Sequence, residues 1–124
     1  PDGSPWKVGV RHPRNEGSFL TVLQLRDKAV STSGDYEKFY TRKGKRLAHI
    51  IDPRSGHPVD TVQAVTVVAE SGFESDVLST ALFVLGPVEG MALIGHRPGA
   101  EARIVGRDGE LHMSTGWPQK VVLY

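Results

Sequence analysis

Several features are missing from this 124-residue chain, and each absence excludes a class of protein. It has no cysteine, which excludes disulfides, thiolate metal sites and a cysteine nucleophile. Its formal net charge is only +1, and no apolar run approaches the roughly 20 residues that span a bilayer. No signal peptide is visible. The opening residues, Pro1 to Pro5, are typical of a linker or of a cut inside a longer protein.

Positive charge is concentrated in one place, the segment from Arg42 to Arg46. Gly44 lies at its centre, and strand-like runs flank it on both sides, so the segment is interpreted as the solvated tip of a hairpin. No aromatic residues alternate with basic ones in the way that favours stacking on bases. We therefore expect no nucleic-acid partner.

Hydrophobic residues make up 39% of the chain, enough for the core of one domain. Alternating and β-rich runs predict strands on both sides of a helical region. The strands are expected at residues 6–11, 19–25, 29–33, 36–40, 47–51, 61–70, 101–105, 109–113 and 120–123. This order lacks regular βαβ alternation and indicates an α+β fold, a mixed or antiparallel sheet with a helix pair packed on it.

The helical region has clear start and stop signals. Ser71 and Glu74 form a capping-box pattern that begins a helix. Gly86 and Pro87 are typical of a helix end and of the start of a second, shorter helix, which extends to about His96. Helical spacing predicts which side chains face the core. They are Val77, Leu78, Ala81, Leu82 and Leu85.

Asp76 and Thr80 are four residues apart on this helix, so they share one helical face. A carboxylate and a hydroxyl so placed can hold a hard divalent cation such as Mg²⁺. The same face is otherwise apolar and is expected to be buried, so its polar groups need an explanation. In the alternative interpretation, Asp76 complements the positive end of the helix and Thr80 bonds back to a carbonyl one turn earlier.

The segment from His49 to Gly56 joins a strand end to a stiff, proline-containing loop. A histidine with a pKa near neutrality can act as a general base, and the guanidinium of Arg54 can bind a phosphate through two parallel hydrogen bonds. The alternatives remain open: His49 is a satisfied polar group at a strand end, Asp52 starts an ordinary turn, and Arg54 pins the loop.

A third polar segment runs from Ser31 to Tyr36 and includes Ser33, Gly34 and Asp35. Small hydroxyl residues and a glycine after a strand expose backbone N–H groups, which can form a nest for an anion such as a diphosphate. A tight turn between two strands explains the same residues equally well.

Together these segments resemble the ApbE family, the FAD:protein FMN transferases, in order and spacing. The segments that carry the resemblance are residues 32–37, 49–56, 65–69 and 75–86. It covers nearly the whole chain, from Trp6 to the last expected strand. The family pattern combines a His-Ile-Ile-Asp-Pro-Arg run with a later Asp-x-x-x-Thr.

The resemblance implies a function. Such enzymes cleave FAD at its diphosphate with Mg²⁺ and place FMN on a threonine of an acceptor protein through a phosphoester bond. Asp76 and Thr80 match the metal ligands, together with a backbone carbonyl from the N-terminal half. His49 matches the base for the acceptor threonine and also lies at the cofactor site. Ser33, Gly34 and Asp35 match a segment that lines the flavin site, and Arg54 is assigned to the developing phosphate charge.

The resemblance also implies an organisation. Family members are two to three times longer, so residues 1–124 are expected to be a single domain or fragment from the C-terminal part. The N-terminal half of the same protein, or another chain, would complete the site. Many members are exported and anchored to a membrane through an N-terminal segment. Two other functions stay open, a flavin-binding or interaction module and an FAD hydrolase that releases FMN and AMP.

Overall fold

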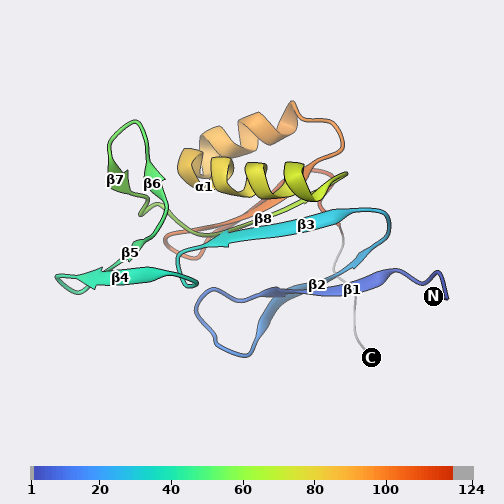
Figure 1. The fold of residues 1–124 in the computed structure, drawn as a ribbon, viewed down its shortest axis with the longest axis horizontal. Coiled ribbons are helices and arrows are strands. Elements are labelled where there is room, and N and C mark those ends of the chain that lie inside the picture. Colours follow the sequence, from blue (N-terminus) through green and yellow to red (C-terminus); the bar gives the residue numbers. More distant parts are fainter. Residues whose placement is uncertain (1, 119–124) are drawn as a thin grey trace.

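The computed structural model describes residues 2–118, and its centre is a four-stranded sheet (Figure 1). The strands lie in the order β10-β9-β8-β3. Their bounds are Ala29–Gly34 for β3, Val62–Ala69 for β8, Glu101–Gly106 for β9 and Leu111–Met113 for β10. Every pairing in this sheet is antiparallel. With a helix on one face, this arrangement confirms the predicted α+β class.

The valine-rich strand β8 lies inside the sheet, between β3 and β9. Val65 and Val67 are fully buried and belong to the larger hydrophobic core, which also contains Ala102 and Ile104 of β9. Strands buried on both faces are expected to be nearly continuous apolar runs. The strand expected at residues 61–70 is therefore confirmed, with slightly narrower bounds, and its composition fits its place inside the sheet.

One face of the sheet is covered by α1, Gly72–Gly95 (Figure 1). Its N-cap is Ser71, whose hydroxyl accepts a hydrogen bond from the backbone N–H of Glu74, as predicted. The helix breaks at Gly86, where φ is 79° and ψ is −178°, and Pro87 follows. That backbone conformation is essentially restricted to glycine. The expected helix pair is present as two arms of α1 that meet at this break.

The length of α1 corrects the expectation that no segment is long and apolar enough to span a bilayer. By length and composition alone, its 24 residues are long and apolar enough to cross a membrane. Inspection of the sequence missed this because a few polar residues interrupt the apolar run. The helix nevertheless packs on the sheet through Leu82 and Phe83, which are fully buried. The core helix of a soluble protein passes the same test, so the finding is weak evidence for a membrane span.

The buried face of α1 differs from the predicted one. Leu78 and Leu82 face the core as expected, but Val77 is 50% exposed. Ser75, Ser79 and Phe83 are buried instead. The prediction counted only apolar side chains, whereas the serines are bonded to the sheet and can enter its interface. The expectation that Asp76 and Thr80 lie on a buried face is also wrong, because both are exposed.

The other face of the sheet is covered by a hairpin of two strands, β1 (Trp6–Arg11) and β2 (Phe19–Leu25). Val10, Leu23 and Leu25 of the hairpin form a second hydrophobic cluster with Val68 of β8. The sheet is thus the middle layer of three, with α1 on one side and the hairpin on the other (Figure 1). The predicted bounds of both hairpin strands are confirmed.

Two smaller hairpins extend beside the sheet (Figure 1). The first consists of β4 (Phe39–Arg42) and β5 (Lys45–Ala48), and the second of β6 (Ile51–Asp52) and β7 (His57–Pro58). Lys43 and Gly44 form the tip of the first, both with positive φ, so the basic segment is a hairpin turn as predicted. Its strands are shifted by a few residues from the predicted bounds. The expected strand at 120–123 lies outside the described residues.

Candidate functional site

Serine hydroxyls join β3 to α1 across the helix-covered face of the sheet. The Oγ atoms of Ser31 and Ser75 are 3.0 Å apart, and those of Ser33 and Ser79 are 2.9 Å apart. Alternate residues of a strand share a face, and residues four apart share a face of a helix, so two pairs can form together. Sequence reasoning missed Ser75 and Ser79. The matching spacing of serines in the two segments was the available signal.

The serine contacts continue to Thr80 and have a definite direction. The Ser79 hydroxyl lies 2.9 Å from the backbone oxygen of Asp76, which can only accept, so Ser79 donates its proton there. Ser79 then accepts from Ser33, and Ser33 in turn accepts from Thr80, whose Oγ1 lies 3.2 Å away. The hydroxyl of Thr80 is therefore a donor to the sheet, and its oxygen keeps lone pairs for another partner.

Asp76 and Thr80 line an open cleft of about 550 Å³ on the outer side of α1. Pro53 contributes from the β6–β7 loop, and the remaining lining is apolar. This part of the cleft consists of Val77, Ala81, Val84 and Leu85. Asp76 and Thr80 are the two polar side chains on this otherwise apolar surface. Such a combination is typical of a ligand site rather than of a solvated helix face.

The oxygen atoms around this cleft suit a hard cation. Within residues 2–118 the carboxylate of Asp76 makes no hydrogen bond or ion pair, and Thr80 offers a neutral oxygen one turn away. The described part of the chain holds no cluster of three or more acidic or histidine side chains that could bind a metal. These residues therefore provide a partial ligand set, and a cation here would need further oxygen ligands.

His49 follows β5 directly and is held by the main chain of Lys38. Its Nδ1 lies 2.9 Å from the Lys38 carbonyl oxygen, which also accepts a hydrogen bond of 3.2 Å from the His49 backbone N–H. A carbonyl can only accept, so in the neutral ring Nδ1 carries the proton. Nε2 is then unprotonated. This side chain is exposed and has the tautomer that a general base requires.

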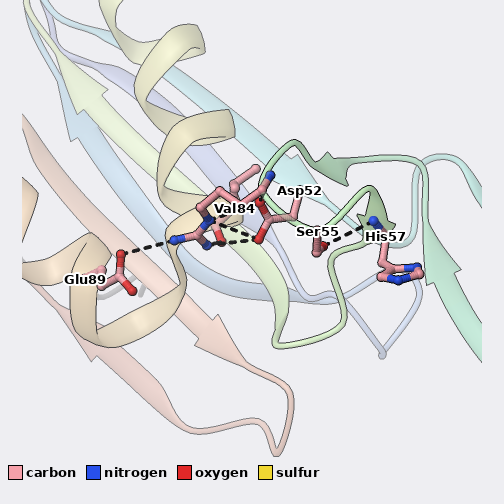
Figure 2. A network of polar contacts seen from close by, with 6 residues as sticks. Asp52, Ser55, His57, Val84 and Glu89 are labelled. Carbon is pink, nitrogen blue, oxygen red and sulfur yellow. Dashed lines mark hydrogen bonds and ion pairs between the residues drawn. The ribbon is translucent and has the colours of Figure 1, made fainter.

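Arg54 pins the β6–β7 loop to α1 through contacts with Asp52, Val84 and Glu89, which are labelled in Figure 2. Its Nη2 donates to Oδ2 of Asp52 at 2.9 Å, while its Nη1 lies 3.4 Å from Glu89 and its Nη2 lies 3.4 Å from the carbonyl oxygen of Val84. The hydrogen bonds from Arg54, and to a lesser extent its positive charge, lower the pKa of Asp52. The hydrogen bond to Asp52 and the negative charges of Asp52 and Glu89 raise the pKa of Arg54. The carbonyl of Val84 precedes the helix break, so Arg54 also satisfies part of a helix end.

The carboxylate of Asp35 is engaged by Arg14 from the β1–β2 loop. The two guanidinium nitrogens lie 2.7 and 2.6 Å from the two carboxylate oxygens, a bidentate pair. The hydrogen bond to Asp35 raises the pKa of Arg14. Gly34 is needed next to this pair, because a Cβ there would lie 2.4 Å from the ring of Tyr36. Sequence reasoning did not identify Arg14, which is 21 residues from its partner.

The structure brings some of the predicted site residues together and leaves others apart. Ser33, Asp76 and Thr80 meet where β3 contacts the first arm of α1. Within residues 2–118, no hydrogen bond links His49, Asp35 or Arg54 to Asp76 or Thr80. Arg54 is nevertheless nearby, because the neighbouring Pro53 lines the same cleft. Asp76 and Thr80 thus form part of a site with oxygen ligands, and His49, which has the tautomer of a general base, lies on a separate hairpin.

Comparison with known proteins places this geometry in a family. The family model described as "ApbE family" matches residues 1–104. The chain belongs to the ApbE family. Among curated relatives, the FAD:protein FMN transferase of Treponema pallidum is 40% identical over 118 residues, which cover 94% of this chain and 33% of that protein. The protein of the same name from Escherichia coli K12 is 33% identical, covering 95% of this chain and 34% of that protein.

Solved structures of the ApbE family have the same fold. The ApbE protein of Thermotoga maritima is 36% identical with a TM-score of 0.83, covering 90% of this chain and 37% of that one. The apo form of the Pseudomonas stutzeri flavinyl transferase ApbE is 40% identical with a TM-score of 0.73, covering 94% and 37%. The chain therefore spans about a third of the length of the curated ApbE relatives that it matches.

Proposed function

We propose that this chain is part of an Mg²⁺-dependent FAD:protein FMN transferase that attaches FMN to a threonine of an acceptor protein. The observation that carries the proposal is the cleft with Asp76 and Thr80, found in a chain that belongs to the ApbE family. Curated relatives bear the name of that activity. FAD is the expected substrate, and the acceptor is a protein with an accessible threonine.

Asp76 and Thr80 would hold the cation. The carboxylate of Asp76 supplies negative charge, and the oxygen of Thr80 has a lone pair available because its proton is directed to Ser33. When bound, Mg²⁺ supplies charge neutralisation on diphosphate oxygens. Because the described residues offer only a partial ligand set, the remaining oxygens are expected from the substrate and from the part of the protein that longer relatives have.

His49 would be the general base. The acceptor threonine oxygen attacks the phosphorus of the FMN half of FAD, and the bond from that phosphorus to the bridging oxygen breaks. AMP leaves with the electron pair of that bond, and the threonine proton passes to Nε2 of His49. The carbonyl of Lys38 keeps Nδ1 protonated, so Nε2 is the basic nitrogen. Base catalysis of this kind contributes about 10²–10⁴-fold to a rate.

The other predicted residues would position the substrate. Ser33 connects β3 to Thr80, and Gly34 leaves room for the ring of Tyr36. Asp35 acts through its pairing with Arg14, which fixes the turn that follows β3. Arg54 holds the β6–β7 loop beside the cleft and, at a short distance from it, adds positive charge for the diphosphate.

The domain organisation is part of the proposal. We infer that residues 1–124 are the C-terminal portion of a longer enzyme, and that an N-terminal portion or another chain completes the flavin and metal sites. The chain spans about a third of its relatives, which supports this inference. An N-terminal membrane anchor outside the bacterial cytoplasm would fit the same organisation.

The test uses the longer polypeptide that contains this chain, with FAD, Mg²⁺ and a threonine-bearing acceptor. Mass spectrometry of the acceptor measures attached FMN. We expect Asp76→Ala to abolish labelling, because the cation loses its carboxylate. Glu16→Ala removes an exposed carboxylate of the β1–β2 loop and should leave labelling unchanged. Wild-type labelling by the Asp76→Ala variant would overturn the metal assignment.

A second measurement separates the two other functions. AMP release is followed together with acceptor labelling. Release of AMP and free FMN without a labelled acceptor would identify an FAD hydrolase, and binding of FAD without either product would identify a binding module. For a transferase, His49→Gln should slow labelling about 10²–10⁴-fold while FAD binding is retained.

A further inference from the structure

A buried arginine on the opposite side of the sheet has no role in the proposed transfer. Arg103 lies in the middle of β9, and its neighbours in sequence, Ala102 and Ile104, belong to the core under α1. Side chains alternate along a strand, so Arg103 faces the side covered by the β1–β2 hairpin. It is therefore separated by the sheet from Asp76 and Thr80.

The side chain of Arg103 is largely buried, and it forms no ion pair in the described part of the chain. The residue is only 8% exposed, and its Nε has no hydrogen-bond partner within residues 2–118. Desolvation lowers the pKa of this arginine. An unpaired buried charge is costly, so a group of this kind normally has an anionic partner.

An acidic side chain on this face, that of Glu101, is already engaged in hydrogen bonds. Glu101 lies two residues before Arg103 on the same strand and therefore on the same face. Its carboxylate accepts from the hydroxyl of Ser114 and, at 3.2 Å, from the backbone N–H of Gly116. It therefore holds the segment after β10 in place. The anion that would pair with Arg103 is therefore not Glu101.

Arg103 lines a cleft of about 610 Å³ between β2 and the segment that follows β10. Thr21 and Thr115 contribute hydroxyls, while Leu20 and Trp117 contribute apolar surface. The volume is within the range of small-molecule sites, which are mainly apolar with a few placed polar groups. A single charged donor beside an apolar wall selects a ligand with an anionic head and an apolar body.

We propose that this cleft binds a small carboxylic acid with an apolar body, whose carboxylate pairs with Arg103. A planar guanidinium matches a carboxylate through two parallel hydrogen bonds. Trp117 and Leu20 contact the body of the acid, and Thr21 bonds the head group. The site is independent of the metal and flavin residues and gives the ApbE fold a second ligand on its other face.

The test measures the binding of phenylpropionate to the longer polypeptide that contains this chain, by isothermal titration calorimetry. We expect saturable binding, and a weakening of affinity of about tenfold or more in Arg103→Gln, because a charge-assisted bidentate contact is lost. Arg107→Gln, which removes an exposed arginine just beyond β9, should bind as the parent does.

A second measurement remains informative if Arg103→Gln folds poorly. Arg103→Met replaces the charge by an apolar side chain, so it should fold at least as stably as the parent without ligand. Phenylpropionate should raise the Tm of the parent but not that of Arg103→Met. Equal Tm increases in the two proteins, or no saturable signal in the titration, would overturn the site.

Three other probes define the ligand class. Phenylpropanol is neutral and should not compete, because it lacks the carboxylate. Acetate should bind more weakly than phenylpropionate, because it lacks the apolar body. Tighter binding of inorganic phosphate than of phenylpropionate would refute the carboxylate assignment, and equal affinity for acetate and phenylpropionate would refute the role of the apolar wall.

Discussion

The two faces of the central sheet differ in how their buried polar groups are hydrogen-bonded. On the face under α1, the serines of β3 pair with serines of the helix, and these hydroxyls are embedded in the larger apolar core. On the face under the β1–β2 hairpin, a smaller aliphatic cluster lies beside Arg103, whose Nε is unpaired within residues 2–118. The buried hydroxyls of the first face satisfy one another, whereas among the described residues the second face has a buried nitrogen that is free to bind a ligand.

This difference assigns different tasks to the faces. Hydrogen bonds between small hydroxyl groups have defined directions, so the helix face fixes the position of Thr80 relative to β3. Apolar contacts in the hairpin cluster are non-directional and mainly contribute stability. We therefore expect substitutions of the helix-face serines to affect both stability and site geometry, and substitutions of Leu23 or Leu25 in the hairpin cluster, which do not line the proposed ligand cleft, to affect mainly stability.

The largest effect is expected from the core under α1. Phe83→Ala should lower the free energy of unfolding by about 3–5 kcal/mol, because a fully buried ring is replaced by a cavity. Urea unfolding followed by circular dichroism measures the change. The matched control is Phe73→Ala on the same helix, where the ring is 82% exposed and the change should stay within about 0.5 kcal/mol.

The hairpin face should lose less from a comparable change. Leu23→Ala is expected to cost about 2–3 kcal/mol, because Leu23 is fully buried but belongs to a smaller cluster that can partly collapse. Urea unfolding followed by circular dichroism again measures the change in the free energy of unfolding. If Leu23→Ala cost more than Phe83→Ala, the hairpin cluster and not the helix core would dominate stability, and the comparison would be reversed.

The break in α1 should be sensitive to one glycine. Gly86→Ala is expected to cost about 1–3 kcal/mol, because φ of 79° with ψ of −178° is unfavourable for any residue with a Cβ. Gly95→Ala on the second arm is the control, since a Cβ there meets nothing within 4 Å. The control should be neutral or slightly stabilising. Equal stability of the two variants would mean that the break relaxes without cost.

The smallest effect is expected from the serine pairs, and it isolates their directional contribution. Ser79→Ala should cost about 1 kcal/mol, the net contribution of a typical buried hydrogen bond. A double-mutant cycle with Ser33→Ala measures the coupling between the two hydroxyls, which lie 2.9 Å apart. Strict additivity would show that the pair does not act as a unit, and the assigned direction of bonding to Thr80 would lose its basis.

Local signals account for the parts of the fold that the sequence predicted well. The cap at Ser71, the break at Gly86 and the tip at Gly44 depend on side chains and φ angles within a few residues. The strand β8 was predicted from its β-rich, valine-containing run, a composition that is typical of a strand buried on both faces. Such features need no knowledge of distant contacts.

Long-range pairings account for what the sequence did not predict. The helix face was assigned from apolar residues, so Val77 was placed inside and Ser79 was not considered, although the hydroxyl of Ser33 on β3 satisfies this buried serine. The pairing of Arg14 with Asp35 spans 21 residues and follows no local pattern. The residue types and spacing of the candidate site were visible in the sequence, but their partners were not.

The contact between His49 and Lys38 has a consequence for how the site can change. The proton of the imidazole is placed by a main-chain oxygen, and a main-chain oxygen is present whatever side chain occupies position 38. The pairing of β4 with β5, and not the side chain of a neighbouring residue, therefore determines which imidazole nitrogen is basic. The sequence around the hairpin can drift, while His49 keeps its orientation as long as the two strands stay in register.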